Sequence, residues 1–403
     1  MVATKMYELG AKANLIRTLY MFGLQQAEKV GEENVFDYSI GNPSVPPPQA
    51  VSDAIVELAT KYSPMEINSY TPAMGLPKVR QGLADYMNQT YGADLKADNF
   101  YLTCGASASL AIIMKALIEQ DGDEVIIIAP YYPEYRTFVT VPGGKAVIVP
   151  PDTKHFQLDM EKLAAAITLR TKAVLINSPN NPSGMVYSAE TLTKLGDLLR
   201  EKSQELGHPI YLISDEPYRE IVYDNIPILY VPKFYKDTII LYSYSKSLSL
   251  PGNRAGYILV PEGVEDGKAI YTAVCGAGRA LGFVNMPNLY QHVILKCMGM
   301  TSDFSVYDQN RKTLYNHLSE MGFDCVYPSG AFYLFIKAPD GDDMQLMENG
   351  KKINLLLVPG TGFGCPGYAR ISYCKQPDMI ERSLPAFQKL RDMYKIGRAS
   401  CRE

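Results

Sequence analysis

The sequence predicts an α/β protein: a large domain with a mostly parallel, seven-stranded sheet sandwiched by helices, plus a smaller α+β domain. Three observations predict it: short β-branched apolar runs, amphipathic segments between them, and a change of pattern after about residue 280. A chain of 403 residues also suits two domains better than one core. We expect a large domain over 46–288, a smaller domain from 1–45 with 289–396, and a tail over 397–403.

Seven apolar runs are the candidate strands of the large sheet. They occupy residues 100–102, 124–128, 145–149, 172–176, 210–213, 238–242 and 256–260. Most are continuous and β-branched, which is typical of strands covered on both faces. Helical patterns at 107–117 and 188–200 lie between them, and Ser188 can cap the second helix. This alternation indicates a largely parallel sheet.

The region after residue 280 has a different pattern. A long helical stretch over 289–321 precedes strand-like runs at 330–335 and 369–373, and a final helix is expected over 377–394. This order predicts the smaller α+β domain, which the segment before Pro46 is expected to join. The tail follows the last helical pattern abruptly and is expected to be disordered or extraneous to the natural chain.

Composition excludes several classes of function. A net charge of −4 and a pI near 5.7 argue against a nucleic-acid surface. No apolar run reaches membrane-spanning length, and the first residues lack a signal-peptide core. Seven dispersed cysteines indicate reduced thiols in a cytoplasmic protein, and four unclustered histidines predict no metal site.

A lysine that follows a predicted strand points to the chemistry. Lys246 comes after the run 238–242, between two serines, and Arg254 follows beyond a Pro-Gly turn. An amine in such a place can condense with an aldehyde, and a guanidinium can hold a phosphate. Pyridoxal phosphate carries both groups. A single lysine is more often a surface charge, so this interpretation depends on the other motifs.

Further polar motifs also follow predicted strands, where ligands bind in an open parallel sheet. Small residues at 103–109 lead into a helix, whose free N–H groups favour an anion, although a plain tight turn has the same pattern. Prolines on both sides of Tyr131-Tyr132 fix the backbone and present a ring, which can stack on a heterocycle or simply pack.

Two more strand ends carry amides and carboxylates. The turn at 177–184 contains asparagines that could donate to a ring oxygen, and it is also an ordinary loop sequence. Asp215 and Glu216 follow the strand at 210–213, and either could pair with a protonated pyridine nitrogen or lie in a solvated loop. Alternation along a strand turns one of the two toward the crevice and the other away.

Taken together, these motifs resemble the class I/II aminotransferase family of fold-type I pyridoxal-phosphate enzymes, with an aspartate aminotransferase-like pattern. The resemblance covers about residues 37 to 387 and rests on 37–43, 69–76, 180–184, 215–218, 243–254 and 369–372. It implies a transaminase that moves the α-amino group of an L-amino acid to a 2-oxo acid by a ping-pong mechanism. It also implies a homodimer with shared active sites. The same cofactor site serves lyases of the C–S β-lyase or aminocyclopropane-carboxylate synthase type, which remain the alternative.

The resemblance implies roles around the cofactor ring. Lys246 forms the aldimine with pyridoxal 5'-phosphate and then moves the proton from the substrate Cα. Asp215 pairs with the pyridinium nitrogen, which keeps the ring an electron sink. Asn181 and Tyr218 hydrogen-bond the phenolic oxygen, and Tyr132 stacks on the ring.

It also implies the groups that hold the two anions. The phosphate is assigned to Ala106, Ser107, Ser243 and Arg254, with Ser245 as a weaker candidate and Tyr70 of the partner subunit as a further contact. Arg370 grips the substrate α-carboxylate, and Gly41 lines that site.

One departure from the family bears on the substrate. Many bacterial aspartate-type members carry a lysine in the phosphate loop that reads a side-chain carboxylate, whereas this loop reads Ala106-Ser107-Ala108-Ser109. Dicarboxylate, aromatic and aliphatic substrates therefore all stay open. The segment 13–22 is expected to cover the site. A transcription regulator on the same fold would need a DNA-binding module, and no such segment precedes residue 37.

Overall fold

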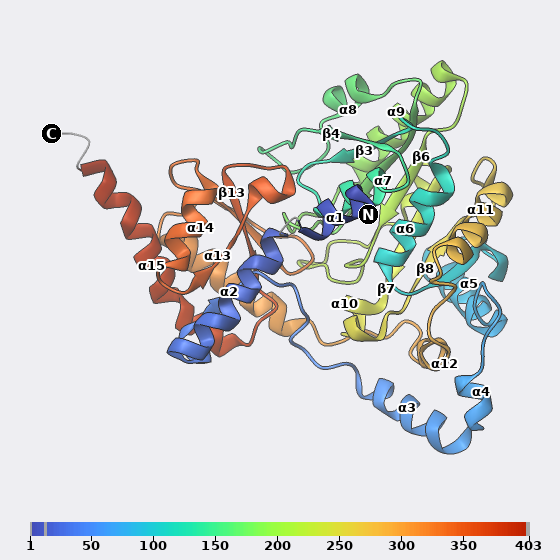
Figure 1. The fold of residues 1–403 in the computed structure, drawn as a ribbon, viewed down its shortest axis with the longest axis horizontal. Helices are drawn as coiled ribbons and strands as arrows, with labels where there is room; N and C mark the ends of the chain where they lie inside the picture. Colours follow the sequence, from blue (N-terminus) through green and yellow to red (C-terminus); the bar gives the residue numbers. More distant parts are fainter. Residues whose placement is uncertain (1, 12–13, 400–403) are drawn as a thin grey trace.

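A computed structural model of the chain describes residues 2–11 and 14–399. The large sheet and its helices form one side of the molecule, and the smaller unit with α14 and α15 forms the other (Figure 1). The strands of the large sheet are β2 (Phe100–Thr103), β3 (Glu124–Ile128), β4 (Lys145–Val149), β5 (Thr171–Asn177), β6 (Tyr211–Asp215), β7 (Thr238–Ser243) and β8 (Gly256–Leu259). All seven coincide with the predicted runs to within two residues at either end, which confirms the predicted fold class.

The strand order in this sheet is β2-β8-β7-β6-β5-β3-β4. Only β8 runs antiparallel to its neighbours, and the remaining pairs are parallel. The carboxyl ends of β5 and β6 are in register, since Asn177 lies opposite Asp215. Polar residues that follow these strands therefore meet at one edge of the sheet.

Helices cover both faces of this sheet, which explains the continuous apolar runs. The helices of this unit are α3 (Gln49–Lys61), α4 (Pro64–Asn68), α5 (Pro77–Tyr91), α6 (Ala106–Leu117), α7 (Glu134–Thr140), α8 (Met160–Ala166), α9 (Ala189–Leu206), α10 (Tyr244–Ser247), α11 (Gly267–Ala280) and α12 (Asn288–Lys296). Along β3, Val125 and Ile127 pack toward α6 and α11, whereas Ile126 and Ile128 pack toward α9. Each such buried side chain stabilises the fold by about 1.5–3 kcal/mol.

The predicted cap of α9 is present. The Ser188 side chain accepts a hydrogen bond from the Thr191 backbone N–H at 3.0 Å. The helix ends at Gly207, which has a φ of +70° that glycine adopts without strain.

The smaller unit contains a four-stranded antiparallel sheet of order β12-β13-β10-β9. Its elements are β9 (Cys325–Val326), β10 (Tyr333–Lys337), β12 (Val358–Pro359), β13 (Tyr368–Ser372), α13 (Ser305–Glu320), α14 (Asp343–Lys351) and α15 (Pro377–Ala399). The N-terminal segment adds α1 (Thr4–Ala11), α2 (Leu15–Val30) and β1 (Phe36–Asp37), and β1 pairs with β11 (Leu355–Leu356) in parallel. The chain therefore returns to this unit from both ends, as the sequence predicts.

The structure differs from the expected boundaries in two places. The helical stretch at 289–321 is two helices, with Gly299 at a φ of +75° between them. The first of these, α12, packs with α3 and α5 in the large unit, because Val293 and Ile294 join its core. The last helix, α15, continues to Ala399 and so extends into the segment predicted as a tail. The rest of that tail lies outside the described residues.

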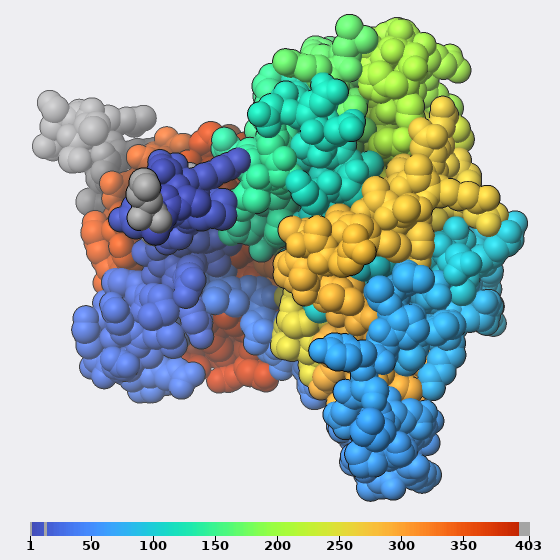
Figure 2. Space-filling model, turned by 45° about the vertical axis from the view of Figure 1, so that its right-hand side comes forward, coloured from blue at the N-terminus to red at the C-terminus, as the bar shows by residue number. Residues whose placement is uncertain are grey.

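Helices α3 and α4 project from the body of the molecule (Figures 1 and 2). Tyr70, just after α4, is fully exposed in the single chain, and Met65 on α4 is 75% exposed. Among the residues that the structure describes, no helix is both long and apolar enough to cross a membrane.

Candidate active site

A cavity of about 1240 Å³ lies at the carboxyl edge of the large sheet, where the smaller unit and the N-terminal segment face it. Its lining includes the following residues that the sequence singled out: Gly41, Ala106, Ser107, Tyr132, Asn181, Asp215, Tyr218, Ser243, Ser245, Lys246, Arg254 and Arg370. Tyr70 is the one predicted site residue that does not line this cavity. Segments that are up to 329 residues apart in the sequence thus meet in one place.

Lys246 lies in the short helix α10, directly after β7. Its side chain is partly buried, and its amine donates a hydrogen bond to the Gly41 carbonyl at 2.7 Å. The ring centroid of Phe332 is 5.4 Å from the same nitrogen. Burial lowers the pKa of the Lys246 amine from 10.5 to about 8, and the charges of Arg370 and Arg254 act in the same direction. A substantial fraction of this amine is therefore neutral near physiological pH.

Asp215 ends β6 and points into the cavity. Its Oδ2 accepts a hydrogen bond from the Tyr135 hydroxyl at 2.5 Å. Its Oδ1 is buried and has no hydrogen-bond partner among the described residues. Burial raises the pKa of Asp215 to about 7. A buried carboxylate oxygen of this kind requires a donor or a cation from a ligand.

Glu216 faces the other way. Its carboxylate accepts from Arg219 Nε at 2.6 Å and from the Ser214 hydroxyl at 2.7 Å, on the far side of the strand. Both Glu216 and Arg219 are buried, so their charges are compensated within the protein. Of the two adjacent acids that the sequence left open, only Asp215 lines the cavity.

The asparagines after β5 tie the neighbouring strand ends together. Asn177 donates to the Asp215 carbonyl at 2.8 Å, and its side-chain oxygen accepts from the Asn181 backbone N–H at 2.8 Å. The Asn181 side-chain oxygen accepts from Arg370 Nη1 at 2.9 Å, which leaves the Asn181 amide nitrogen available as a donor at the cavity. Asn177 therefore positions Asn181 as well as the backbone of Asp215.

Arg370 lies on β13, on the opposite wall of the cavity. Besides Asn181, its guanidinium donates to the Ser39 carbonyl, and its Nε is buried without a partner among the described residues. The rings of Tyr333 and Phe363 lie 4.7 and 4.8 Å from its central carbon. No carboxylate of the described residues forms an ion pair with it. This fixed, unneutralised guanidinium suits a carboxylate ligand.

The N-terminus of α6 and Arg254 lie together at one end of the cavity. Gly105 precedes the helix at a φ of +81°, and a Cβ at this position would lie 2.7 Å from Arg254 Nη2. Arg254 Nη1 donates to the Pro251 carbonyl at 2.8 Å, which fixes the guanidinium. The Ser243 and Ser245 hydroxyls are 2.8 Å apart at the same edge. Free helix N–H groups, hydroxyls and a cation together favour a phosphate.

The N-terminal segment approaches the cavity from the other side. Asn14 caps α2 and donates through its side chain to Glu134 at the start of α7, at 2.7 Å. Ile16, Arg17 and Phe22 of α2 line the cavity. The dark blue N-terminal residues lie against the teal part of the large unit in Figure 2. The expected cover of the site is therefore present from Asn14 onward, and residues 12–13 lie outside the described residues.

Comparisons with known proteins identify the family. The model of the family "Aminotransferase class I and II" matches residues 33–387. A curated aspartate aminotransferase of Thermotoga maritima is 32% identical, and the match covers 89% of this chain and 91% of that protein. A curated aspartate aminotransferase of Geobacillus stearothermophilus is 30% identical over 90% of this chain and 93% of its own length. The chain belongs to the class I and II aminotransferases.

Solved structures agree with this aminotransferase in fold. The crystal structure of an aminotransferase from Eubacterium rectale superposes with a TM-score of 0.96 at 51% identity, and covers 98% of this chain and 99% of that one. The aspartate aminotransferase of Thermotoga maritima superposes with a TM-score of 0.84 at 28% identity, and covers 97% of this chain and 100% of that one. The enzyme is accordingly a transaminase, as the sequence predicts.

Three residues of the aminotransferase cavity were missed in the sequence. Tyr135 bonds Asp215, Tyr333 bonds the Tyr218 hydroxyl at 2.7 Å, and Asn177 holds the strand ends together. Tyr135 and Asn177 lie inside motifs that follow predicted strands, so their position in the sequence could have marked them as site residues. Tyr333 lies 115 residues from its partner, and nothing local in the sequence marks it.

Proposed function

We propose that this aminotransferase uses pyridoxal 5'-phosphate to move the α-amino group of an L-amino acid to a 2-oxo acid in two successive half-reactions. The observation that carries the proposal is that the partly buried Lys246 amine, whose pKa is lowered, shares one cavity with an unpartnered carboxylate oxygen of Asp215. The first group can bond an aldehyde, and the second can accept from a protonated ring nitrogen.

The residues of the cavity fit this cofactor. Asp215 Oδ1 would accept the ring N–H, the α6 N-terminus with Arg254 would hold the phosphate, and Tyr132 would lie against the ring. When bound, the cofactor supplies an aldehyde for the amine and an electron sink for the substrate Cα. Ring binding would keep Asp215 ionised, because a cationic partner offsets the burial that raises its pKa.

The side chains of the cavity would perform the remaining steps of proton transfer and substrate binding. The Lys246 amine would accept and return the proton at the substrate Cα, a task for which its lowered pKa is suited. Arg370 would bind the α-carboxylate through its fixed guanidinium. Asn181 and Tyr218 would hydrogen-bond the ring oxygen, and Tyr333 would hold Tyr218 in place. The α2 side chains would exclude water.

The curated relatives suggest which substrates to test first. They are named aspartate, aspartate/prephenate and aromatic-amino-acid aminotransferases. We therefore propose aspartate and an aromatic amino acid as candidate donors. We also propose a cytoplasmic homodimer in which Tyr70 of the partner subunit reaches the phosphate, since Tyr70 is fully exposed in the single chain.

A half-reaction experiment tests the proposal. The purified enzyme, loaded with pyridoxal phosphate, is mixed with single amino acids while the cofactor absorbance and the 2-oxo acid are followed. We expect the amine form of the cofactor to accumulate with one equivalent of 2-oxo acid per site. Catalytic release of ammonia and pyruvate would instead show a lyase. The Lys246→Ala variant serves as the blank, because it lacks the amine.

A further inference from the structure

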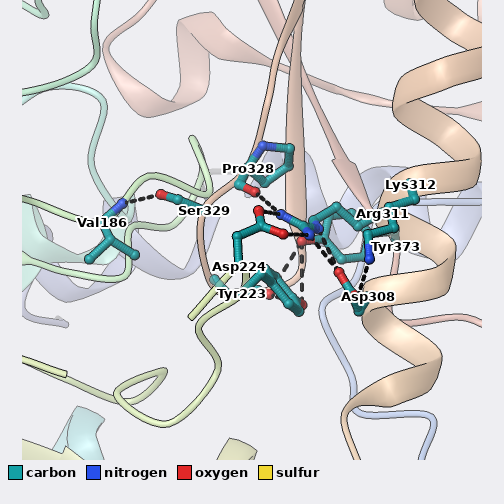
Figure 3. Close-up of polar contacts among 10 residues, drawn as sticks. Val186, Tyr223, Asp224, Asp308, Arg311, Lys312, Pro328, Ser329 and Tyr373 are labelled. Atoms are coloured by element: carbon teal, nitrogen blue, oxygen red, sulfur yellow. Dashed lines mark hydrogen bonds and ion pairs between the residues drawn. The ribbon is translucent and has the colours of Figure 1, made fainter. Parts of the chain in front are cut away.

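A buried arginine outside the cavity joins three parts of the fold. Arg311 on α13 is fully buried, and its guanidinium uses all five of its donors. Two go to Asp224 at 2.7 and 2.9 Å, two to Asp308 at 2.6 and 2.9 Å, and one to the Pro328 carbonyl at 2.8 Å. The Tyr223 ring lies 4.3 Å from its central carbon. Figure 3 shows these side chains converging on Arg311.

The three acceptors belong to different segments. Asp224 lies in the segment after β6 that also carries Tyr218, Asp308 lies on α13 itself, and Pro328 lies between β9 and β10. The pair of Arg311 and Asp308 is local to the helix. The other two contacts tie the large unit to the segment that leads into β10.

This segment, residues 328–331, is called the strap here. It is hydrogen-bonded to the segments after β5 and after β6. Its bonds are Ser329 N and Gly330 N to Gly184 O at 2.9 and 2.8 Å, Val186 N to Ser329 Oγ at 2.8 Å, Ala331 N to Ile221 O at 2.8 Å, and Tyr223 N to Ser329 O at 3.1 Å. A Cβ on Gly330 would lie 2.7 Å from Pro179 and 2.8 Å from the Ile221 carbonyl, so the approach is close. The strap therefore has little freedom while these bonds hold.

Of the two residues that follow the strap, Tyr333 lines the cavity and Phe332 lies beside the Lys246 amine. Phe332 faces the Lys246 amine, and Tyr333 bonds the Tyr218 hydroxyl. The Arg370 guanidinium also lies over the Tyr333 ring. A small displacement of the strap would consequently move groups that border the amine and the guanidinium at the same time.

We propose that Arg311 is a positioning residue: by holding the strap against Asp224, it sets Phe332 and Tyr333 in the active site. A lysine cannot replace it, because an ammonium offers three donors and no planar fork. Loss of the Arg311 guanidinium would disturb the side chains at the cavity as well as lower the free energy of unfolding. The activity readout of this inference rests on the proposed function, whereas its structural readout does not.

Two variants and one control test it. Arg311→Lys removes the planar guanidinium, and Asp224→Asn weakens only the link between Arg311 and the segment after β6. Asp224 has a φ of +55°, a conformation that asparagine adopts readily, so this second variant should fold. Arg80→Lys is the matched control, since Arg80 is also buried and bonds Asp98 at 2.9 Å and the Ala97 carbonyl at 3.0 Å. Arg80 does not line the cavity.

The first measurement is amide hydrogen exchange on the cofactor-free protein, and the second is steady-state kinetics with saturating cofactor. We expect faster exchange over 328–333 in both test variants, a kcat lowered roughly tenfold, and a donor KM changed less than about twofold. Arg80→Lys should lower the thermal midpoint without these changes. Normal strap exchange and normal kcat in Arg311→Lys and Asp224→Asn would show a structural role only. If the wild type lacks transaminase activity, the hydrogen-exchange result still decides whether Arg311 restrains the strap.

Discussion

At the residue scale, the site depends on the buried Asp215 and the partly buried Lys246, whose pKa values the protein shifts in opposite directions. Burial lowers the pKa of the Lys246 amine to about 8 and raises the pKa of the Asp215 carboxyl to about 7. Both shifts favour the neutral form, as expected for groups removed from water. A cofactor with a cationic ring nitrogen would restore the charge on Asp215, whereas Lys246 needs to be neutral to react.

Replacement of Asp215 tests its partner. Asp215→Asn keeps the volume and can still contact Tyr135, so the fold and cofactor binding should survive. We expect turnover to fall about 100-fold, because a charge-assisted hydrogen bond to the ring nitrogen is lost. The measurement is the single-turnover rate constant of the half-reaction, with visible absorbance to confirm cofactor occupancy. Turnover close to that of the wild type would assign the ring nitrogen to another group.

The lowered pKa of Lys246 predicts a pH dependence for cofactor capture. Only the neutral amine attacks an aldehyde, and the neutral fraction grows as the pH rises through the pKa. The rate at which the cofactor-free protein takes up pyridoxal phosphate should therefore rise with pH and level off above a midpoint near 8. Stopped-flow absorbance measures this rate. A midpoint above about 10, the range of an ordinary lysine, would contradict the burial argument.

At the scale of elements, the sequence predicts the positions of the strands better than the side-chain contacts between the two units. All seven strands of the large sheet were predictable, because continuous β-branched runs have few alternative structures. The break between α12 and α13 was missed, although Gly299 and the polar run 301–303 are signals for a helix end. The contact between Tyr218 and Tyr333 depends on how two units pack, which local pattern does not encode. The strand pattern alone left Asp215 and Glu216 open and the family resemblance chose Asp215, which the structure places in the cavity.

The start of α6 offers a test of the proposed phosphate site. Gly105→Ala places a Cβ against Arg254 Nη2 and forces alanine into a positive φ. We expect a loss of roughly 1–3 kcal/mol of stability from the backbone strain, and weaker cofactor binding from the displaced guanidinium. The measurement is the Kd of pyridoxal phosphate by fluorescence titration.

Gly207→Ala is the matched control for this change. Gly207 also has a positive φ, of +70°, and a Cβ there meets nothing within 4 Å. It should lose about 1 kcal/mol of stability, less than Gly105→Ala, because Gly207 has a ψ of 21° and Gly105 a ψ of 173°. It should keep the wild-type affinity for the cofactor. Equal cofactor affinity in both variants would mean that Gly105 has no part in the phosphate site.

At the scale of the whole molecule, the active site needs contributions from both units and, in our proposal, from a second subunit. Gly41 and Arg370 come from the smaller unit, whereas Lys246 and Asp215 come from the large one. Tyr70 follows shortly after the projecting helix α4, and its exposed hydroxyl has no hydrogen-bond partner among the described residues. A partner subunit would give this exposed side chain a role.

The proposed dimer predicts complementation between variants. Tyr70→Phe should sediment as a dimer and bind the cofactor more weakly, by about 1.5–3 kcal/mol for one hydrogen bond to a charged phosphate. Mixed dimers of Tyr70→Phe and Lys246→Ala should contain one cavity with both native groups. At limiting cofactor, activity should therefore rise above that of either homodimer. No gain in verified mixed dimers would place Tyr70 outside the neighbouring site.

Covalent capture of the cofactor tests the central claim most directly. Borohydride reduction of the loaded enzyme, followed by proteolysis and mass spectrometry, locates the residue that bonds the aldehyde. We predict one pyridoxyl-phosphate group per chain, on Lys246. The Lys246→Ala variant, in which Arg254 and Asp215 are intact, should carry no label at position 246. A label on any other lysine of the native enzyme, with Lys246 unmodified, would contradict it.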